Sequence, residues 1–185
     1  DISEKGPLRF SATYEERYQT MNIANLFGQN VILTEKIYGT SITIYRDGDE
    51  FGYCMRNWEL KIPDSGTSNR YWSALGDGFA LNEFAEYCQT HNLNLALRGE
   101  VFGAGVQTNK NNRWSQYPKN GVRWFSALNL DTREYLTFKE FRLLVIKLNE
   151  YITQKYSDKH IDLFTTVEYW HAVLSQDLIN VIEKT

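Results

Sequence analysis

Cysteine and histidine are scarce in this sequence, and the few that occur are scattered. The 185 residues include two cysteines, Cys54 and Cys88, and three histidines whose spacing matches no metal site. The sequence therefore predicts neither a disulfide framework nor a protein-bound metal. Two isolated cysteines are typical of a reducing compartment, so we expect a cytoplasmic protein of cellular, phage or viral origin.

Long hydrophobic runs and an excess of basic charge are also absent. No apolar stretch approaches the roughly 20 residues of a membrane-spanning helix, and the first residues lack a signal-peptide pattern, so no membrane association is expected. The net charge is −3, which means that any contact with nucleic acid has to be local. The length fits a single domain over residues 1–185.

One lysine stands where a structural role is hard to assign. Lys36 follows an apolar run at residues 31–33 and precedes Gly39 and an alternating strand that begins at Ser41. Desolvating a charge at the rim of a core is costly. We therefore expect Lys36 to be partly buried, with its pKa lowered from about 10.4 so that it can act as a nucleophile. Gly39 would supply a tight turn or a close backbone approach. A solvated lysine before a turn is the alternative.

The residues Glu35-Lys36-Ile37-Tyr38-Gly39 resemble the nucleotidyl-lysine motif of the covalent nucleotidyltransferases. This superfamily contains ATP-dependent DNA ligases, RNA ligases and mRNA capping enzymes. Three later segments resemble its further motifs, in the same order along the chain. They are Gly52–Asn57 with the nucleotide-contacting Arg56, Leu95–Gly103 with the sugar-binding Glu100, and Arg123–Leu130 with Phe125 or Leu128 to stack on adenine.

Within the superfamily the sequence is most similar to the RNA ligase 2-like branch, which includes phage RNA ligases and RNA-editing ligases. Residues 103–107 match its glycine-rich turn ending in glutamine. Tyr38, Ser41 and Asn129 depart from the family pattern, which has His or Asp, Asn, and Asp at these places. The family's fourth and fifth motifs, an acidic residue before a Gly-Val-Val strand and a Lys-x-Lys pair, are not found. We therefore expect a truncated or a naturally short adenylation domain.

The resemblance implies an ATP-dependent RNA ligase that uses Mg²⁺. Lys36 would form lysyl-AMP, the AMP would pass to the 5′-phosphate of an RNA, and a 3′-hydroxyl would then displace it. The residues beside the nucleophile would contact the nucleotide together with the later motifs: Glu35, Ile37, Gly39, Arg56, Glu100, Phe125 and Leu128.

Other interpretations stay open at this point. A DNA ligase or a capping-type nucleotidyltransferase would share the motifs, and a ligase remnant that binds nucleic acid or a partner would share the fold without the chemistry. Glu100 could instead be a structural glutamate paired with Arg98.

A polar segment over residues 108–121 combines basic and aromatic side chains without a periodic pattern. It is either a solvated loop or a loop that contacts RNA phosphates and stacks bases, with Trp114 and Tyr117 as the aromatic residues. The candidate RNA-binding residues are Lys110, Arg113, Lys119 and Arg123.

Periodicity and turn signals indicate an α+β fold of antiparallel sheets flanked by helices. We expect strands at 31–46, 50–57, 94–102 and 122–130, with the Asp47-Gly48-Asp49 turn joining the first two. Residues 79–90 and about 18 residues after the capping box Thr137–Glu140 are expected to form amphipathic helices. Weaker helical patterns occupy 14–27 and 166–174.

Overall fold

The computed structural model describes residues 2, 4–10, 18–109, 111–156 and 162–184. Within it the chain forms two compact units. Unit 1 comprises residues 1–10 and 37–167, and unit 2 comprises residues 11–36 and 168–185. Each unit contains its own sheet, and the expectation of a single domain stays a prediction.

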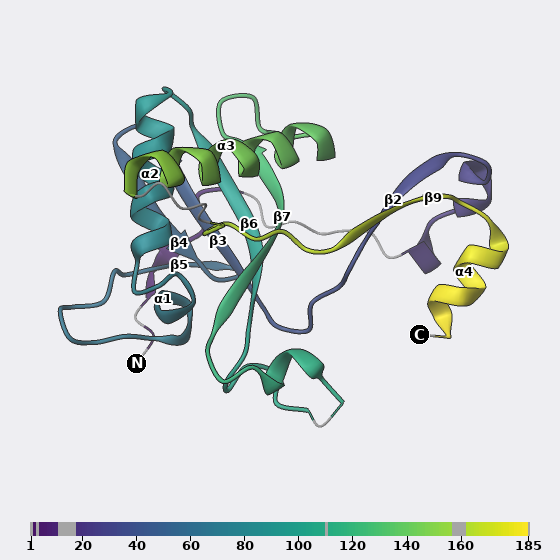
Figure 1. Ribbon diagram of the computed structural model, residues 1–185, viewed down its shortest axis with the longest axis horizontal. Coiled ribbons are helices and arrows are strands. Elements are labelled where there is room, and N and C mark those ends of the chain that lie inside the picture. The colour runs from purple at the N-terminus through teal and green to yellow at the C-terminus, as the bar shows by residue number, and fades with distance from the viewer. Residues whose placement is uncertain (1, 3, 11–17, 110, 157–161, 185) are drawn as a thin grey trace. The chain divides into compact units, whose positions relative to one another are not determined.

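Unit 1 is built on a seven-stranded antiparallel sheet (Figure 1). The turn predicted at Asp47-Gly48-Asp49 joins the third and fourth strands through a two-residue loop, since Asp47 pairs with Glu50. Gly48 there has a φ of 61°, a conformation that glycine adopts without strain. Across the sheet the order is β1 (Glu4–Pro7), β5 (Trp58–Leu60), β4 (Glu50–Cys54), β3 (Thr40–Asp47), β6 (Leu95–Phe102), β7 (Gly121–Asn129) and β8 (Glu134–Tyr135).

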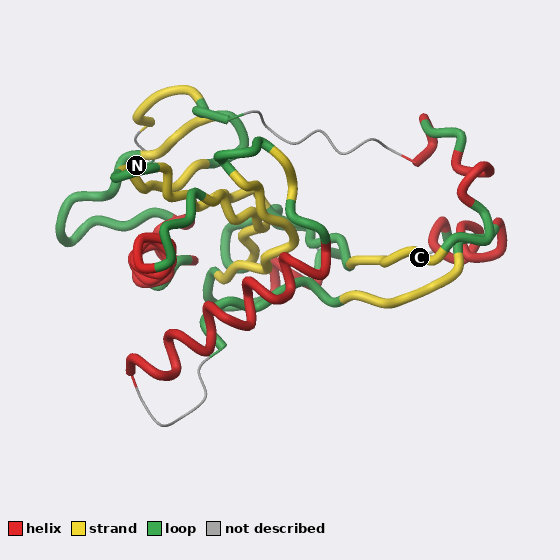
Figure 2. Tube along the Cα trace, turned by 90° about the horizontal axis from the view of Figure 1, so that it is seen from above, coloured by secondary structure: helices red, strands yellow, loops and turns green. Residues whose placement is uncertain are grey.

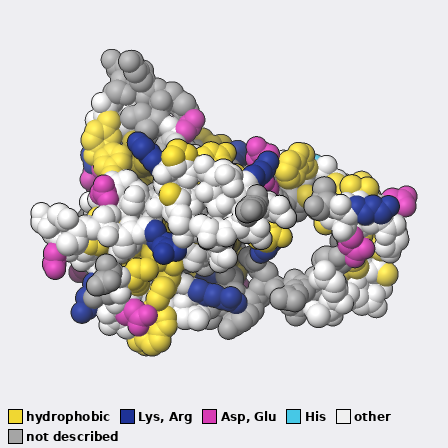
Figure 3. Space-filling model, turned by 90° about the horizontal axis from the view of Figure 1, so that it is seen from below, with side chains coloured by type: hydrophobic (Ala, Val, Ile, Leu, Met, Phe, Trp, Pro, Cys, Tyr) yellow, Lys and Arg dark blue, Asp and Glu magenta, His cyan; other side chains and the backbone are white. Residues whose placement is uncertain are grey.

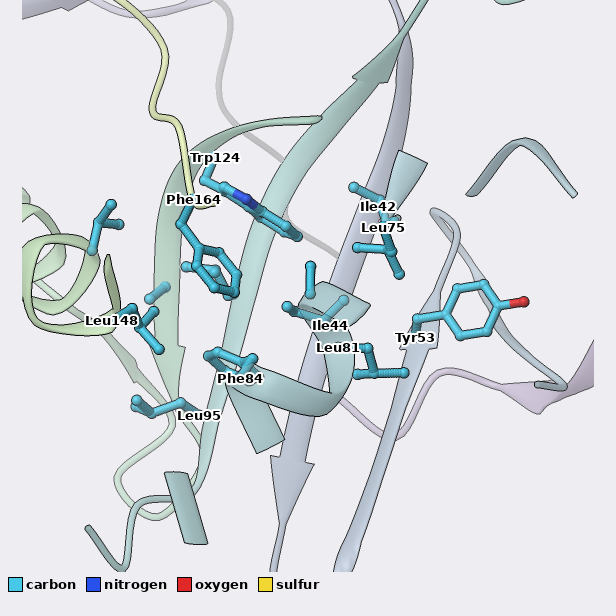
Figure 4. Close-up of a cluster of buried hydrophobic side chains, with 14 of the residues drawn as sticks. Ile42, Ile44, Tyr53, Leu75, Leu81, Phe84, Leu95, Trp124, Leu148 and Phe164 are labelled. Atoms are coloured by element: carbon cyan, nitrogen blue, oxygen red, sulfur yellow. The ribbon is translucent and has the colours of Figure 1, made fainter. Parts of the chain in front are cut away.

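Helices α2 (Phe79–Thr90) and α3 (Phe138–Tyr156) cover one face of this sheet. Figure 2 shows the long helices in red on one side of the yellow strands. The main core lies between the two layers, with a shorter helix, α1 (Arg70–Ala74), at its edge. Figure 4 shows side chains that meet there, among them Ile42, Ile44, Leu81, Phe84, Trp124, Leu148 and Phe164.

The amphipathic patterns predicted both long helices correctly. Helix α2 has the expected bounds, and all of its predicted apolar positions, including Cys88, are buried. Helix α3 begins at the capping box, where the backbone N–H of Thr137 donates to Glu140 Oε2 at 2.7 Å and the N–H of Glu140 donates to Thr137 Oγ1 at 3.3 Å. Each of these bonds satisfies a donor that the start of a helix would otherwise leave without a partner.

The predicted strand at 50–57 is shorter than expected, because β4 ends at Cys54. The N–H of Met55 donates to the carbonyl of Trp58 at 2.9 Å, which closes a turn that contains Arg56. Arg56 therefore lies between two strands and not within one. The short elements β1, β5, β8 and α1 carry too few residues to show a pattern in the sequence.

Unit 2 contains a two-stranded antiparallel sheet of β2 (Asn30–Thr34) and β9 (Tyr169–Val173). The pairing continues one step further, since the N–H of Glu35 donates to the carbonyl of Glu168 at 2.9 Å. Among the described residues of this unit there are also three helices: η1 (Tyr18–Thr20), η2 (Ile23–Leu26) and α4 (Gln176–Glu183). Ser175 caps α4 by accepting from the N–H of Leu178.

Three predictions that involve unit 2 were wrong. Residues 31–46 are not one strand, because β2 and β3 belong to different sheets. Residues 166–174 contain β9 and no helix, since the run from Tyr169 to Val173 is rich in aromatic and β-branched residues that pair with β2. Residues 14–27 form two short 3₁₀ helices from position 18 onward, and residues 14–17 lie outside the described part. Over the described ranges, no helix is long and apolar enough to cross a lipid bilayer.

Candidate nucleotide-binding site

The face of the unit 1 sheet that α2 and α3 leave uncovered carries polar side chains at its centre. Residues paired directly across antiparallel strands point to the same face, and successive residues point to opposite faces. Ile42 and Leu97 point toward the helices, so their neighbours along β3 and β6 point away from them. The resulting polar strip has two rows of paired residues, Ser41, Glu100 and Arg123 in the first and Thr43, Arg98 and Ser126 in the second.

Hydrophobic clusters border the polar strip at both ends of its strands. The strip's two rows therefore lie between two buried apolar clusters, and Phe125 at the edge of the second is partly exposed. The first cluster contains Phe10, Tyr45, Cys54, Ala96, Leu128 and Leu130. The second contains Ile37, Phe102, Trp114 and Val167, with Phe125 packed against it.

The polar strip contains two arginines and one glutamate. Arg98 is 4% exposed, and its guanidinium lies 5.4 Å from the ring centroid of Tyr135. Glu100 is half-buried and stands directly opposite Arg123 in the ladder, while Arg98 is two positions away along the same strand. The direct cross-strand neighbours of Glu100 are thus Ser41 and Arg123, and the pairing with Arg98 that the sequence suggested stays a prediction.

Arg56 lies at the end of the sheet where the first row of the strip is found. It is exposed and comes two residues after Cys54, which pairs with Thr43. Ser41 comes two residues before Thr43 on β3, and β3 runs antiparallel to β4. The register of β3 and β4 therefore directs Arg56 toward the Ser41 end of the strip.

Gly39 makes the close backbone approach that the sequence predicted. A Cβ at this position would lie 2.0 Å from the carbonyl oxygen of Val101 and 2.8 Å from Cγ of Glu100. Ile37, two residues earlier, is 4% exposed in the second hydrophobic cluster. Its side chain therefore anchors the segment, and residues 37–39 are held firmly against β6.

Asn112 fixes the same segment from the other side, and the sequence analysis did not identify it. Its side-chain amide donates to the carbonyls of Tyr38 and Gln107, each at 3.0 Å, and its Oδ1 accepts from the N–H of Trp114 at 3.1 Å. Asn112 is 8% exposed. An asparagine before a helical turn is a recognisable cap, but nothing in the sequence indicates its bond to Tyr38.

Lys36 and Glu35 belong to unit 2, where they follow β2. Glu35 is half-buried and Lys36 is exposed, which differs from the partial burial predicted for Lys36. The reason is that β2 lies in a two-stranded sheet with an exposed side at every second residue, and not at the rim of a core. The peptide bond from Lys36 leads directly to Ile37, the anchored residue of unit 1.

The two residues predicted to stack on adenine differ in accessibility. Leu128 is 4% exposed in the first hydrophobic cluster, where it packs with Phe10 and Tyr45. Phe125 is only partly buried. It lies at an irregularity in the ladder, because Arg98 pairs with Ser126 and the next residue of β6 pairs with Trp124. Such bulges turn a side chain away from the regular alternation of a strand.

Two of the predicted RNA-binding residues lie against the same ring, since the guanidinium groups of Arg113 and Arg123 are 5.1 Å and 5.8 Å from the ring centroid of Trp114. Arg113 and Lys119 are exposed in the segment between β6 and β7, Arg123 belongs to the polar strip, and Lys110 lies outside the described residues. The guanidinium of Arg123 lies 5.2 Å from the ring centroid of Phe102. On the face displayed in Figure 3, Lys and Arg side chains lie in separate patches, in keeping with the negative net charge.

A buried carboxylate ties the first residues of the chain to the sheet face that holds the strip. Glu59 is 4% exposed, accepts hydrogen bonds from Tyr45 and from Lys5 Nζ at 2.7 Å, and forms an ion pair with Arg9 at 3.4 Å. Burial alone would raise the pKa of Glu59, but these hydrogen bonds and positive charges outweigh it and lower the pKa. Burial and Glu59 together raise the pKa of Tyr45.

The RNA ligase family profile matches residues 29–180, which include the polar strip and the segment around Lys36. The chain belongs to the RNA ligase family. No curated protein matches the sequence. The α+β fold predicted from periodicity and turn signals is confirmed by solved structures.

Solved RNA ligase mutants from Naegleria gruberi superpose closely on this chain. One with AMP and Mn has a TM-score of 0.78 at 28% identity, over 98% of this chain and 50% of that chain. An apo mutant has a TM-score of 0.78 at 28% identity, over 97% and 50%. A mutant with ATP and Mn has a TM-score of 0.76 at 28% identity, over 95% and 48%. The chain thus spans about half the length of these ligases.

Two further observations bear on ligands of this RNA ligase family member. In the described part of the chain, no group of three or more His, Cys, Asp or Glu side chains could hold a metal ion. An open depression of about 360 Å³ lies at the Arg46 end of β3, far along the strand from Ser41, and contains none of the predicted site residues. Its lining residues are Arg46, Gly48, Asp49, Phe51, Asn82, Ala85, Glu86 and Gln89.

Proposed function

We propose that this chain carries the nucleotide-binding part of an ATP-dependent RNA ligase, with Lys36 as its covalent nucleophile. The observation that supports this most directly is the packing of residues 37–39 against β6. Gly39 allows a backbone contact that no other residue could make, and it does so beside Glu100. The chain directly after Lys36 is therefore fixed against the strand that bears the proposed sugar-binding residue.

The proposed first step is transfer of AMP from ATP to Lys36. The unprotonated Nζ of Lys36 attacks the α-phosphorus of ATP, an N–P bond forms, and the bond from that phosphorus to the bridging oxygen of pyrophosphate breaks. The proton lost from Nζ passes to solvent. The N–P bond of the resulting lysyl-AMP would then break as an oxygen of the RNA 5′-phosphate bonds to the phosphorus of AMP, which frees Lys36. A 3′-hydroxyl would attack that 5′-phosphate, form the phosphodiester and release AMP.

The polar strip and its borders suit the parts of ATP. Glu100 would accept hydrogen bonds from the ribose hydroxyls, and Arg56 would bind the ribose or phosphate. Phe125 is the better of the two candidates for contact with adenine, because Leu128 is almost fully buried. Glu35 and the backbone of Ile37 and Gly39 would complete the contacts around the nucleotide.

The solved Naegleria ligases contain ATP or AMP with Mn, which supports ATP and a divalent ion as requirements here, and we propose Mg²⁺. The described residues contain no acidic cluster for the ion, so it would be held through the phosphates of ATP. There it would neutralise phosphate charge and orient the leaving group.

The proposed acceptor is RNA with a 5′-phosphate and a 3′-hydroxyl, as the family membership suggests. Arg113 and Lys119 are exposed and would contact phosphates, Arg123 would act from the polar strip, and Lys110 stays a candidate from the sequence. With two cysteines and no disulfide, the chain would work in the cytoplasm of a cell or an infected host.

Covalent labelling with radioactive ATP tests the proposal. Lys36→Ala and Lys36→Arg should both abolish the label, because neither side chain can present an unprotonated amine, and the far-UV circular dichroism should be unchanged since Lys36 is exposed. Lys147→Ala, which removes an exposed lysine of α3, is the matched control and should label fully. Residual label in either Lys36 variant would overturn the assignment. Label from GTP in place of ATP would indicate a capping-type enzyme, and no label from any nucleotide would indicate a non-catalytic remnant.

A further inference from the structure

Tyr117 presents one face of its ring to solvent while the rest of the ring is packed. The side chain lies in the segment between β6 and β7 and is 47% exposed. Its ring is stacked on Trp114, with centroids 5.6 Å apart and planes 18° apart, and forms a T-shaped pair with Phe102 at 5.2 Å and 72°. Because Trp114 covers one face, the opposite face is the one available for a ligand.

The support beneath Tyr117 is rigid. Trp114 is 7% exposed and Phe102 is 5% exposed, and both belong to the second hydrophobic cluster with Ile37. The backbone of this segment is tied to the core by Asn112 and closed at its base by Asn120, whose amide donates to the carbonyl of Ala104 at 2.9 Å. A held aromatic ring loses little conformational freedom when a ligand binds to it.

The charge around this ring is positive, although the protein as a whole is acidic. Residues 101–130 contain four basic and no acidic residues, whereas the net charge of the chain is −3. Arg113 lies with its guanidinium 5.1 Å from the ring centroid of Trp114, and Lys119 is exposed two residues after Tyr117. An exposed aromatic ring with exposed cations before and after it along the chain is a combination with which proteins bind single-stranded nucleic acid.

We propose that Tyr117 stacks on one unpaired base of the RNA substrate while Arg113 and Lys119 bind the phosphates on either side. The proposal rests on RNA being the substrate, as inferred above, and makes its substrate class narrower. A base inside a duplex has both faces covered by its neighbours, so the ring selects a single-stranded segment. Trp114, which the sequence suggested as a second stacking residue, supports Tyr117 from below and takes no base itself.

The binding of a fluorescent, 5′-phosphorylated 12-nucleotide RNA, followed by anisotropy, tests the role of the ring. Stacking on one base is worth about 1–3 kcal/mol, so Tyr117→Ala should raise Kd by roughly 5- to 150-fold. Tyr117→Phe and Tyr117→Trp keep a flat ring and should restore binding. Phe51→Ala is the matched control, because it removes a 40% exposed aromatic side chain of β4. It should leave Kd unchanged.

RNAs in which one nucleotide at a time lacks its base identify the stacked position. At one position, the RNA without its base should bind the wild-type protein as weakly as intact RNA binds Tyr117→Ala. Binding of that base-free RNA to Tyr117→Ala should be no weaker still, because both changes remove the same stacking contact. If Tyr117→Ala fails to fold, Tyr117→Leu, which keeps an apolar side chain against Trp114 but has no flat ring, replaces it in the same comparison. The proposal is overturned if every base-free position costs the two proteins equally.

Two further outcomes complete the test. Arg113→Ala and Lys119→Ala should each reduce the slope of log Kd against log salt by about one, whereas Tyr117→Ala should shift Kd at an unchanged slope. An equal loss of affinity for single-stranded and fully paired RNA in Tyr117→Ala would refute stacking. Labelling of Lys36 by ATP needs no RNA, so failure of that reaction would contradict the proposed function. Intact labelling together with an unchanged Kd for RNA in Tyr117→Ala would contradict the stacking proposal alone.

Discussion

The side-chain amide of Asn112 donates a hydrogen bond to the main-chain carbonyl of Tyr38 at 3.0 Å, across 74 positions of sequence. This bond joins the segment that bears Tyr117 to the segment that follows Lys36. Gly39 packs closely against β6 because it has no Cβ, so this contact and the hydrogen bond from Asn112 both hold residues 37–39. A residue far from the nucleotidyl-lysine motif therefore takes part in setting its geometry.

Replacing Asn112 with Ala should weaken both folding and AMP transfer. The change leaves two carbonyls without their donor, which costs about 1–3 kcal/mol of the free energy of unfolding. A displacement of Lys36 by about 1 Å would slow labelling by ATP up to 100-fold. Asn112→Asp should be at least as harmful, because it turns a donor into a negative acceptor that faces two carbonyls. Asn111→Ala, at an exposed neighbouring position, should change neither the melting temperature nor the labelling rate. Wild-type labelling by Asn112→Ala would show that the bond has no positioning role.

Glu100→Ala and Arg56→Ala should each slow labelling of Lys36 by about 10²- to 10³-fold, as expected when a charged contact to the reacting nucleotide is lost. Both variants should melt within a few degrees of the wild type, because Glu100 is half-buried and Arg56 is exposed. Arg56→Lys should recover little activity, since an ammonium lacks the forked geometry of a guanidinium. Glu134→Ala, an exposed glutamate of β8, serves as the control. Loss of the folded state in Glu100→Ala would make Glu100 a structural residue.

Gly39→Ala should disturb the site without touching a polar side chain. The added Cβ would meet the carbonyl oxygen of Val101 at 2.0 Å, and backbone can move away only by shifting a strand. Overpacking of this kind costs about 1–3 kcal/mol. Thermal unfolding and ATP labelling should both show the effect. Gly6→Ala is the matched comparison, because a Cβ at Gly6 has no neighbour within 4 Å, and it should behave as the wild type does. A fully active Gly39→Ala would mean that residues 37–39 are not held as closely as described.

The buried carboxylate of Glu59 should make the protein sensitive to acid. Its pKa is lowered in the folded state from an ordinary value near 4.5, so the unfolded state binds the proton first as the pH falls. The stabilisation is therefore complete above about pH 4.5 and is lost as the pH falls through the folded-state pKa. Urea unfolding from pH 3 to 7 measures it.

Glu59→Gln should be less stable than the wild type at pH 7 by about 1–3 kcal/mol. The difference should shrink as the pH falls below about 4.5 toward the lowered folded-state pKa of Glu59, because the unfolded wild type then gains a proton that the folded protein binds less readily. Glu150→Gln removes an exposed carboxylate of α3 and should run parallel to the wild type over the whole range. A constant gap between wild type and Glu59→Gln would contradict the proposed linkage.

The sequence predicted correctly the elements whose periodic apolar residues form a single buried face. Helix α3 is the clearest case, since its capping box and its apolar stripe agree with each other and with its packing. The run from Tyr169 to Val173 was misread because five residues fit a short helical turn as well as a strand, and only pairing with β2 decides between them.

The site was predictable where chemistry depends on residue type and order along the chain. Gly39 and Glu100 meet in the structure as the motif order suggested. The exposure of Lys36 was not predictable, because it depends on which strand pairs with β2 at a distance of more than 130 residues. The hydrogen bond from Asn112 to Tyr38 was not predictable for the same reason, because its partners are far apart in the sequence.

The burial of both cysteines has a practical consequence. Cys54 and Cys88 are 1% and 0% exposed, and burial raises the pKa of each thiol to about 12. Only the thiolate reacts with maleimides, so the folded wild-type protein should resist such reagents at neutral pH. A single cysteine introduced on the surface, for example by Gln116→Cys next to Tyr117, would then be the one reactive thiol in the molecule. A dye attached there would allow single molecules of the protein to be watched as RNA arrives and leaves, with no need to remove a native side chain from the core.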